Sequence, residues 1–177
     1  MEICGGMPLT FEERVSEELD ALYAGALFLS GGHETRASDL VVEAVRLASS
    51  EYSGRGEIGS FTQWMEGMLA RSLLRDGSRE GLEQRTRGGK DAGPDQLDAD
   101  ALDGLGWADL VGAAAVLPPQ ARVAVWLVTL RRWSYEQVER TMGVGRDGLR
   151  ELLACRAQLV GAAVAGSRGG KARGTGG

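Results

Sequence analysis

Apolar residues recur at intervals of three and four through most of the first half of the chain, which is the spacing of one helical face. The first such stretch begins at Thr10, with Glu13 three residues later in the arrangement of a capping box. A second stretch covers about 37–50, and a third begins at Ser60. No alternation typical of a β-strand competes with this pattern, which therefore predicts a small helical domain over 10–76.

The second half of the chain shows the same spacing in shorter stretches. A Leu-Pro-Pro sequence at 117–119 separates one short helix from another that is predicted over about 120–132. Ser134 begins the next helix, a Gly-Val-Gly turn follows at 143–145, and a longer helix is predicted to run to about 164. Two helices joined by a short glycine-containing turn are typical of a helix-turn-helix, although many other helical hairpins share this shape.

The segment between these two regions has a different character. Residues 77–105 are rich in glycine and charge and have no apolar stripe of useful width, which predicts a flexible linker. We therefore expect an all-α protein with two small helical domains, 1–76 and 106–165, of which the second contains the helix-turn-helix. The last segment, 166–177, is glycine-rich and basic, and we expect a disordered tail there.

Composition excludes several classes of protein. The chain has 177 residues, of which 43% are hydrophobic, which is enough for folded cores. No apolar run reaches the roughly 18 residues of a membrane span, and the first 13 residues lack the pattern of a signal peptide. The two cysteines have no metal-ligand neighbours, which disfavours a zinc site or a disulfide framework. We therefore expect a cytoplasmic protein without membrane insertion.

The sequence also gives no support to an enzyme. It has a single histidine, no nucleotide-binding glycine loop and no nucleophile beside a base. We therefore expect no catalytic residue, no metal and no cofactor.

Charge is distributed unevenly along the chain. Residues 1–105 carry 10 basic and 20 acidic residues, and residues 106–177 carry 10 basic and 5 acidic residues. The two parts have net charges of −10 and +5, which sum to the −5 of the whole chain. The charge of the whole chain therefore does not support binding of nucleic acid, and only a local basic surface can.

Six short segments, taken together and in order, resemble the extracytoplasmic-function sigma factors of bacterial RNA polymerase. In the first half, the segments ASDLVVEAV, FTQWM and ARSLLRD resemble the family's A-x-D-L-V-Q-E/D-x-F, F-x-x-W-L and A-R-N-x-x-x-D; they lie at 37–45, 61–65 and 70–76. In the second half, LPPQAR, WSYEQV and MGV resemble L-P-x-x-x-R, L-S-Y-E-E-I and L-G-V; they lie at 117–122, 133–138 and 142–144. The resemblance spans about 15–164.

The resemblance implies two helical domains that bind core RNA polymerase, at its β′ clamp and β flap, and also promoter DNA. The family grips the polymerase clamp with the D-L-V-Q-E helix, which implies that role for Asp39, Leu40, Val42 and Glu43. Its F-x-x-W and A-R-N helix faces the melted −10 strand, which implies contacts from Trp64, Arg71, Ser72 and Arg75. Its last helices bind the −35 element in the major groove, which implies contacts from Ser134, Tyr135, Gly145, Arg146, Arg150 and Arg156.

The segment after the turn departs from the family pattern, which is close to S-x-G-T-V-K-S-R-L-x-R-A-R. Arg150 keeps the family's lysine as a cation, but Glu151 stands where the family has serine, and Leu152 stands where it has arginine. Acidic side chains near phosphates oppose binding by repulsion. We therefore expect poor binding of duplex DNA by the isolated protein.

Three functions stay open at this point. The first is a sigma factor that directs promoter-specific initiation. The second is a sigma-like interaction protein that binds polymerase or a regulatory partner without reading promoters. The third is a helix-turn-helix repressor with an acidic partner domain, which leaves the ordered motifs of the first half unexplained. The family often works with an inhibitory anti-sigma factor, so the resemblance also leaves a partner of that kind open.

Overall fold

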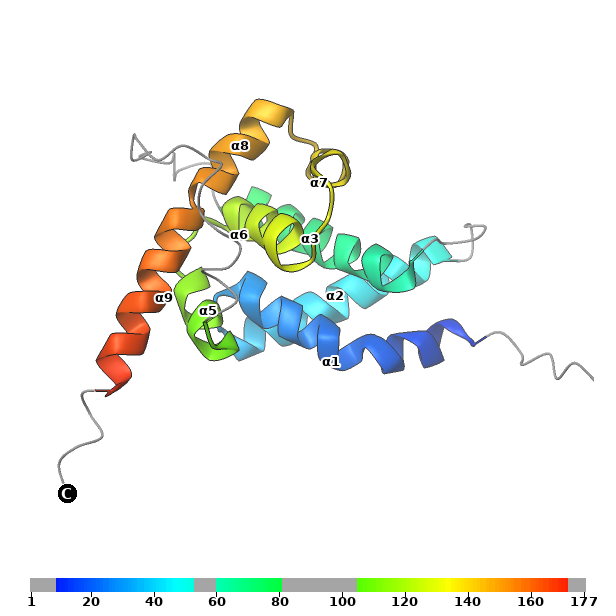
Figure 1. Ribbon diagram of the computed structural model, residues 1–177. Coiled ribbons are helices and arrows are strands. Elements are labelled where there is room, and N and C mark those ends of the chain that lie inside the picture. Colours follow the sequence, from blue (N-terminus) through cyan, green and yellow to red (C-terminus); the bar gives the residue numbers. More distant parts are fainter. Residues whose placement is uncertain (1–8, 53–59, 81–104, 172–177) are drawn as a thin grey trace, which may run out of the picture.

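The computed structural model describes residues 9–52, 60–80 and 105–171, and over these residues the secondary structure is helical (Figure 1). The first half contributes three long helices: α1 (Phe11–Ser30), α2 (Glu34–Tyr52) and α3 (Phe61–Glu80). The second half contributes shorter elements: α5 (Trp107–Ala114), α6 (Pro119–Val125), the π-helical turn η1 (Trp126–Leu130), α7 (Tyr135–Met142), α8 (Arg146–Ala154) and α9 (Arg156–Lys171). The all-α fold class is confirmed. Within the described residues, no helix is both long enough and apolar enough to cross a membrane.

Side chains that the sequence marks as caps begin these helices. The Thr10 backbone N–H donates to the Glu13 carboxylate at 2.8 Å, and the Thr10 hydroxyl accepts from the Glu13 N–H at 3.3 Å. Ser134 and Gln137 form the same reciprocal pair at the start of α7. Each pair satisfies N–H groups that have no partner inside the helix. The capping boxes predicted at Thr10 and Ser134 are therefore confirmed.

The helices α1, α2 and α3 pack against one another through a continuous apolar core. Its centre consists of side chains that are fully buried: Ala26, Leu29, Ala44, Met65 and Leu69. In the second half, α5 packs against α9 and α6 against α8, around Val123, Leu127, Leu149 and Leu159. Each helix buries an apolar stripe, as its periodicity predicts.

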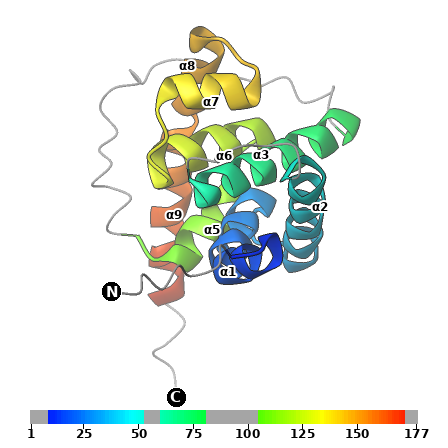
Figure 2. The ribbon, with the colours of Figure 1, turned by 90° about the vertical axis from the view of Figure 1, so that its right-hand side faces the viewer.

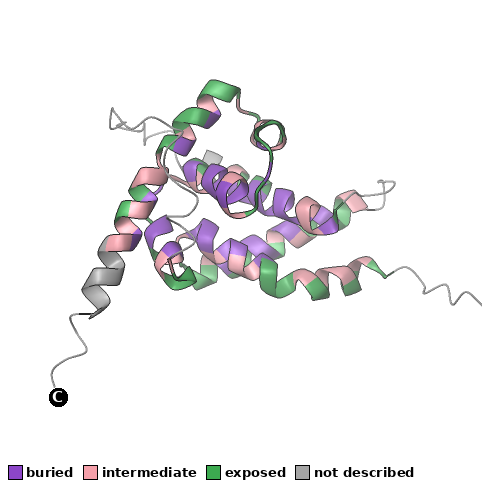
Figure 3. Ribbon diagram, in the orientation of Figure 1, coloured by how far each residue is buried: buried purple, intermediate pink, exposed green. Residues whose placement is uncertain are grey.

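The two halves also pack directly against each other, and their buried residues form one cluster. Helix α1 contacts α5, α6 and η1, and α3 contacts α6 and α7. Figures 1 and 2 show α3 between α1 and α2 on one side and α6 and α7 on the other, while α5 lies beside α1. Figure 3 shows buried residues on α6 as well as on α3. The two predicted domains therefore share one buried core in this structure.

Several predicted boundaries differ from the structure. Helix α2 begins at Glu34, before the predicted start at 37, and α3 continues to Glu80, into the predicted linker. The rest of that linker, 81–104, lies outside the described residues. Extending an existing helix costs less than nucleating a new one, which favours such longer ends.

The predicted long helix to about 164 is interrupted at Cys155. There the Cys155 N–H donates to the Leu152 carbonyl at 3.3 Å, a bond across three residues, and α9 begins at the next residue. Helix α9 then continues to Lys171, so 166–171 are helical and the expected disordered tail is corrected for this part. Residues 172–177 lie outside the described residues.

Candidate functional site

The residues expected to bind polymerase lie on α2, but they do not all share its outer face. Asp39 and Val42 are exposed, and Val42 has 58% of its surface accessible. Glu43 is half-buried and pairs with Arg46 at 3.4 Å. Leu40 is only 6% exposed, because it lies about 100° from Asp39 around the helix, on the stripe that packs into the core. In this structure Leu40 is part of the core, and its expected contact with polymerase stays a prediction that this burial does not support.

The four residues expected to contact the melted −10 strand lie on α3 in three different environments. Arg71 and Arg75 are exposed, and Arg71 lies 3.6 Å from the Glu51 carboxylate. Trp64 is half-buried. Ser72 is 2% exposed and its hydroxyl has no hydrogen-bond partner within the described part of the chain. Ser72 is therefore not accessible to a DNA strand in this structure, and its expected contact with the −10 strand stays a prediction that this burial does not support.

Aromatic rings surround Trp64 and explain its burial. Its ring centroid lies 6.1 Å from that of Tyr52 and 5.7 Å from that of Phe61. Phe11 joins the same group at 5.0 Å from Tyr52, and the Arg14 guanidinium lies 4.6 Å above the Phe61 ring. Such offset ring pairs add to the stability of a helix junction. In this structure Trp64 supports the start of α3.

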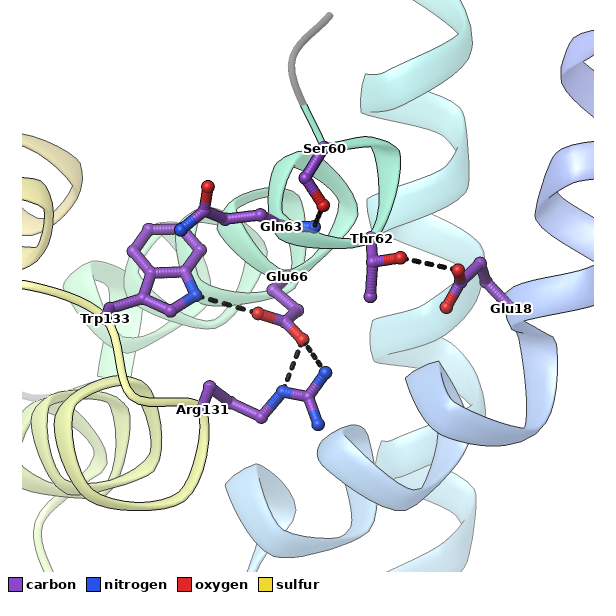
Figure 4. Close-up of polar contacts among 7 residues, drawn as sticks. All are labelled: Glu18, Ser60, Thr62, Gln63, Glu66, Arg131 and Trp133. Carbon is purple, nitrogen blue, oxygen red and sulfur yellow. Dashed lines mark hydrogen bonds and ion pairs between the residues drawn. The ribbon is translucent and has the colours of Figure 1, made fainter.

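A further polar cluster on α3 has no counterpart among the sequence-predicted residues. The Glu66 carboxylate accepts a hydrogen bond from the Trp133 indole N–H at 2.8 Å, and it forms an ion pair with Arg131 (Figure 4). Glu66 is 5% exposed, and both partners come from the segment between η1 and α7. The only sequence signal is a single carboxylate between the apolar residues Met65 and Met68.

The region predicted to be a helix-turn-helix consists of α7, a three-residue turn and α8. Gly143 ends α7 with φ at 67°, a left-handed conformation that favours glycine, and Gly145 is the N-cap of α8. Ser134 caps α7, so its hydroxyl is already an acceptor for a backbone N–H. Tyr135 is exposed at the first turn of α7. The two helices contact each other directly.

Arg140, Arg146 and Arg150 each pair with an acidic residue of the same region. The Arg146 Nε donates to the Glu139 carboxylate at 3.2 Å, and the Arg150 guanidinium lies 3.7 Å from the Asp147 carboxylate. Residues 134–156 hold four arginines and four acidic residues, so their formal net charge is zero. Arg156, the fourth arginine, is half-buried at the start of α9. The Arg150–Asp147 pair is exposed on both sides, and such pairs are worth only about 0–1 kcal/mol, so a phosphate can replace the acidic partner.

Two groups near these surfaces have shifted pKa values. Burial lowers the pKa of Arg122, and the nearby charge of Arg36 lowers it further. Burial raises the pKa of the Cys155 thiol, which lies at the junction of α8 and α9. Among residues 9–52, 60–80 and 105–171, no group of three or more His, Cys, Asp or Glu side chains is placed to hold a metal ion.

Comparison with known proteins supports the fold. The chain resembles the sigma factor RpoE of Bartonella quintana, whose structure was determined in complex with the anti-sigma factor NepR, with a TM-score of 0.60 and 20% sequence identity. The match covers 86% of this chain and 95% of that chain. No protein-family model and no curated protein matches this sequence. The chain therefore has a sigma-factor-like fold.

Proposed function

We propose that this chain is a sigma factor of the extracytoplasmic-function type, which binds core RNA polymerase and directs promoter-specific initiation. The observation that carries the proposal is the extent of the fold likeness, which includes both halves of the chain and nearly the whole of a known sigma factor. The ordered motifs from 37–45 to 142–144 lie on or next to the helices α2, α3, α6 and α7. The protein itself carries out no chemistry in this proposal.

Helix α2 provides the surface for polymerase. Asp39 and Val42 are exposed, and Glu43 lies at the border of the same face. An exposed valine beside carboxylates suits a partner that offers an apolar pocket and nearby cations. The β′ clamp of core polymerase is the proposed partner of this face.

Promoter contacts come from two separate helices. Arg71 and Arg75 are one turn apart on the exposed side of α3, where they can follow the phosphates of a melted strand. Arg146 and Arg150 are likewise one turn apart at the start of α8, where they can enter the major groove of the −35 element. Further proposed contacts come from Tyr135 at the first turn of α7, Gly145 at the cap of α8 and Arg156 beyond the end of α8.

A second function is favoured by a specific observation. Residues 134–156 have no formal net charge, and Arg140, Arg146 and Arg150 contact acidic neighbours in this segment. This is the arrangement expected of a sigma-like interaction protein that binds polymerase or a regulatory partner without reading promoters. An anti-sigma factor, the class of partner present in the RpoE structure, is proposed as a further partner of this chain.

Run-off transcription with purified core polymerase and a library of promoter fragments distinguishes the two functions. The sigma-factor proposal requires discrete start sites that appear only when the protein is added. Arg150→Glu should abolish these starts and leave polymerase binding intact, while Glu12→Gln on the exposed side of α1 is the control. Polymerase binding without any protein-dependent start supports the interaction protein instead. Absence of polymerase binding contradicts the sigma factor, and it leaves the interaction protein only with a regulatory partner.

A further inference from the structure

Helix α3 is covered on two sides, which a three-helix domain alone does not require. All six residues from Met65 to Ala70 are buried. Successive residues point about 100° apart around a helix, so six buried residues in a row cover its whole circumference. One side of α3 packs on α1 and α2, and the other contacts α6 and α7.

The second covered side holds the Glu66 carboxylate, and its partners belong to the other half of the chain. Trp133, itself only 9% exposed, donates its indole N–H, and Arg131 supplies the positive charge. Next to Glu66, a Cβ atom on Gly67 would lie 3.5 Å from the Trp133 ring, which is ordinary contact. A buried carboxylate is tolerated only while it is paired and hydrogen-bonded, so this side of α3 depends on the segment 131–133.

The segment that supplies these partners has an unusual backbone. Arg132 has φ at 58°, a left-handed conformation that is uncommon for residues other than glycine, and it follows the π-helical turn η1. The Arg131 N–H donates to the Trp126 carbonyl and the Trp133 N–H to the Leu127 carbonyl, each at 2.9 Å. Such a conformation persists where the surrounding contacts hold it, and here the contacts include Glu66.

A second contact shows that the two halves fit closely. Gly25 of α1 faces the indole ring of Trp126, and a Cβ atom at position 25 would lie 2.7 Å from that ring. Only glycine allows this approach without a shift of one helix. The packing of α1 on η1 therefore has the complementarity of a protein interior.

This packing conflicts with the proposed function as long as it persists. The −10 and −35 elements are centred about 25 base pairs apart, which is roughly 85 Å of B-form DNA. In this structure α3 and α7, which carry residues proposed for the two elements, are in direct contact. The 24 residues of 81–104 can span at most about 80 Å, so the covalent chain permits a wide separation.

We propose that this structure is a closed, autoinhibited state of the protein, and that the contact of Glu66 with Arg131 and Trp133 is the latch that holds it closed. The inference rests on the proposed function, because it assigns a regulation to the same two DNA-binding surfaces. Opening breaks the latch and frees the two halves to reach the two promoter elements. Core polymerase favours the open state, because it binds the separated halves more tightly than the closed ones.

Fluorescence energy transfer in the full-length chain tests the latch. Both native cysteines are replaced by serine, and dyes are attached at Asp20→Cys on α1 and Glu151→Cys on α8, two exposed sites in different halves. The test variants are Glu66→Gln and Arg131→Gln, of which the second alters a more exposed side chain. The control is Glu18→Gln, because Glu18 bonds to Thr62 within the first half (Figure 4).

We expect the efficiency of energy transfer to fall in both test variants and to stay unchanged in the control. The circular dichroism spectrum should show the same helical content in all of these proteins. With core polymerase and a promoter library, we expect the test variants to start transcription roughly fivefold more often than the wild type. Gly25→Ala, which crowds the contact of α1 with Trp126 and leaves the three latch residues in place, should act in the same direction.

The outcomes separate the latch from the proposed function. Unchanged energy transfer in Glu66→Gln and Arg131→Gln overturns the latch, whatever the transcription assay shows. Lower energy transfer with no gain in transcription, in a wild type that does initiate, overturns autoinhibition. If the wild type neither binds polymerase nor initiates, the proposed function fails, and the energy transfer still decides whether Glu66 holds the halves together.

Discussion

Arg122 of α6 donates a hydrogen bond to the Leu29 carbonyl in the last turn of α1, at 2.7 Å. Its Nε also donates to the Leu117 carbonyl at 2.9 Å. Carbonyls in the last turn of a helix have no partner within that helix, so a side chain from elsewhere has to supply one. One guanidinium therefore joins the end of α1 to the turn before α6, and links the two halves of the chain.

Arg122→Met is expected to lower the free energy of unfolding by about 2 kcal/mol, because it leaves two carbonyls without this donor in a partly buried site. Urea denaturation followed by circular dichroism measures the effect. Arg46→Met, at an exposed site on α2, is the matched control and should change stability by less than about 0.5 kcal/mol. Equal stability of the two variants would contradict the role of Arg122.

Val42→Glu is expected to weaken binding to core polymerase at least about tenfold, because a charge replaces the exposed apolar group at the centre of the proposed α2 surface. Anisotropy of a labelled protein titrated with core polymerase gives the dissociation constant. Leu19→Glu introduces the same charge at an apolar residue of α1 with similar exposure. If both variants bind polymerase with the affinity of the wild type, the proposal that α2 binds polymerase is wrong.

Glu139→Gln is expected to strengthen binding to promoter duplex, because it releases Arg146 for a phosphate. One additional phosphate contact steepens the salt dependence, so the slope of log K against log salt should become more negative by about 1. Filter binding over a range of salt concentrations measures both quantities, and Glu17→Gln on the exposed side of α1 is the control. An unchanged slope would show that Arg146 does not reach the DNA.

Ser72→Ala is expected to leave transcription starts unchanged and to stabilise the fold by up to about 1 kcal/mol, because a buried hydroxyl without a partner is lost. Run-off transcription and urea denaturation provide the two readouts. Arg71→Ala, on the exposed side of the same helix, should reduce starts without a comparable gain in stability. Loss of starts in Ser72→Ala would restore this residue to the −10 contact.

Cys155 makes the stability of the fold depend on pH in the alkaline range. Because burial raises the pKa of its thiol, the folded state holds this proton more tightly than the unfolded state. The stabilising contribution is fully present below the pKa of the unfolded thiol, about 8.5, and is lost as the pH rises through the folded pKa. Urea denaturation of the wild type and Cys155→Ala at pH 7 to 10 should therefore show the stability difference change with pH. A constant difference would contradict this effect.

Local signals in the sequence predict much of the fold. The capping boxes at Thr10 and Ser134, the glycine turn at 143–145 and the helical spacing all depend on residues close together in the chain. The motif order also places the exposed residues Asp39 and Val42 on one helix. These features follow from propensity and periodicity, which are properties of the sequence itself.

The rest depends on tertiary packing that local patterns do not specify. Leu40 and Ser72 belong to family-like motifs, but the helical phase places both in the core. Glu66 and Trp133 are 67 residues apart, and nothing near either of them indicates that they meet. The close packing of the two halves could not be predicted either. The acidic first half and the basic second half show a difference in net charge, and this difference does not indicate which helices meet.

The central claim, that this chain directs RNA polymerase to promoters, is tested most directly by run-off transcription on genomic promoter fragments with purified core polymerase. The wild type and Val42→Glu are compared at equal concentration, with Leu19→Glu as the control. The account predicts discrete starts with the wild type and the control, sharing upstream sequences near −10 and −35, and few or none with Val42→Glu. The absence of any protein-dependent start, although polymerase binds the protein, would contradict it.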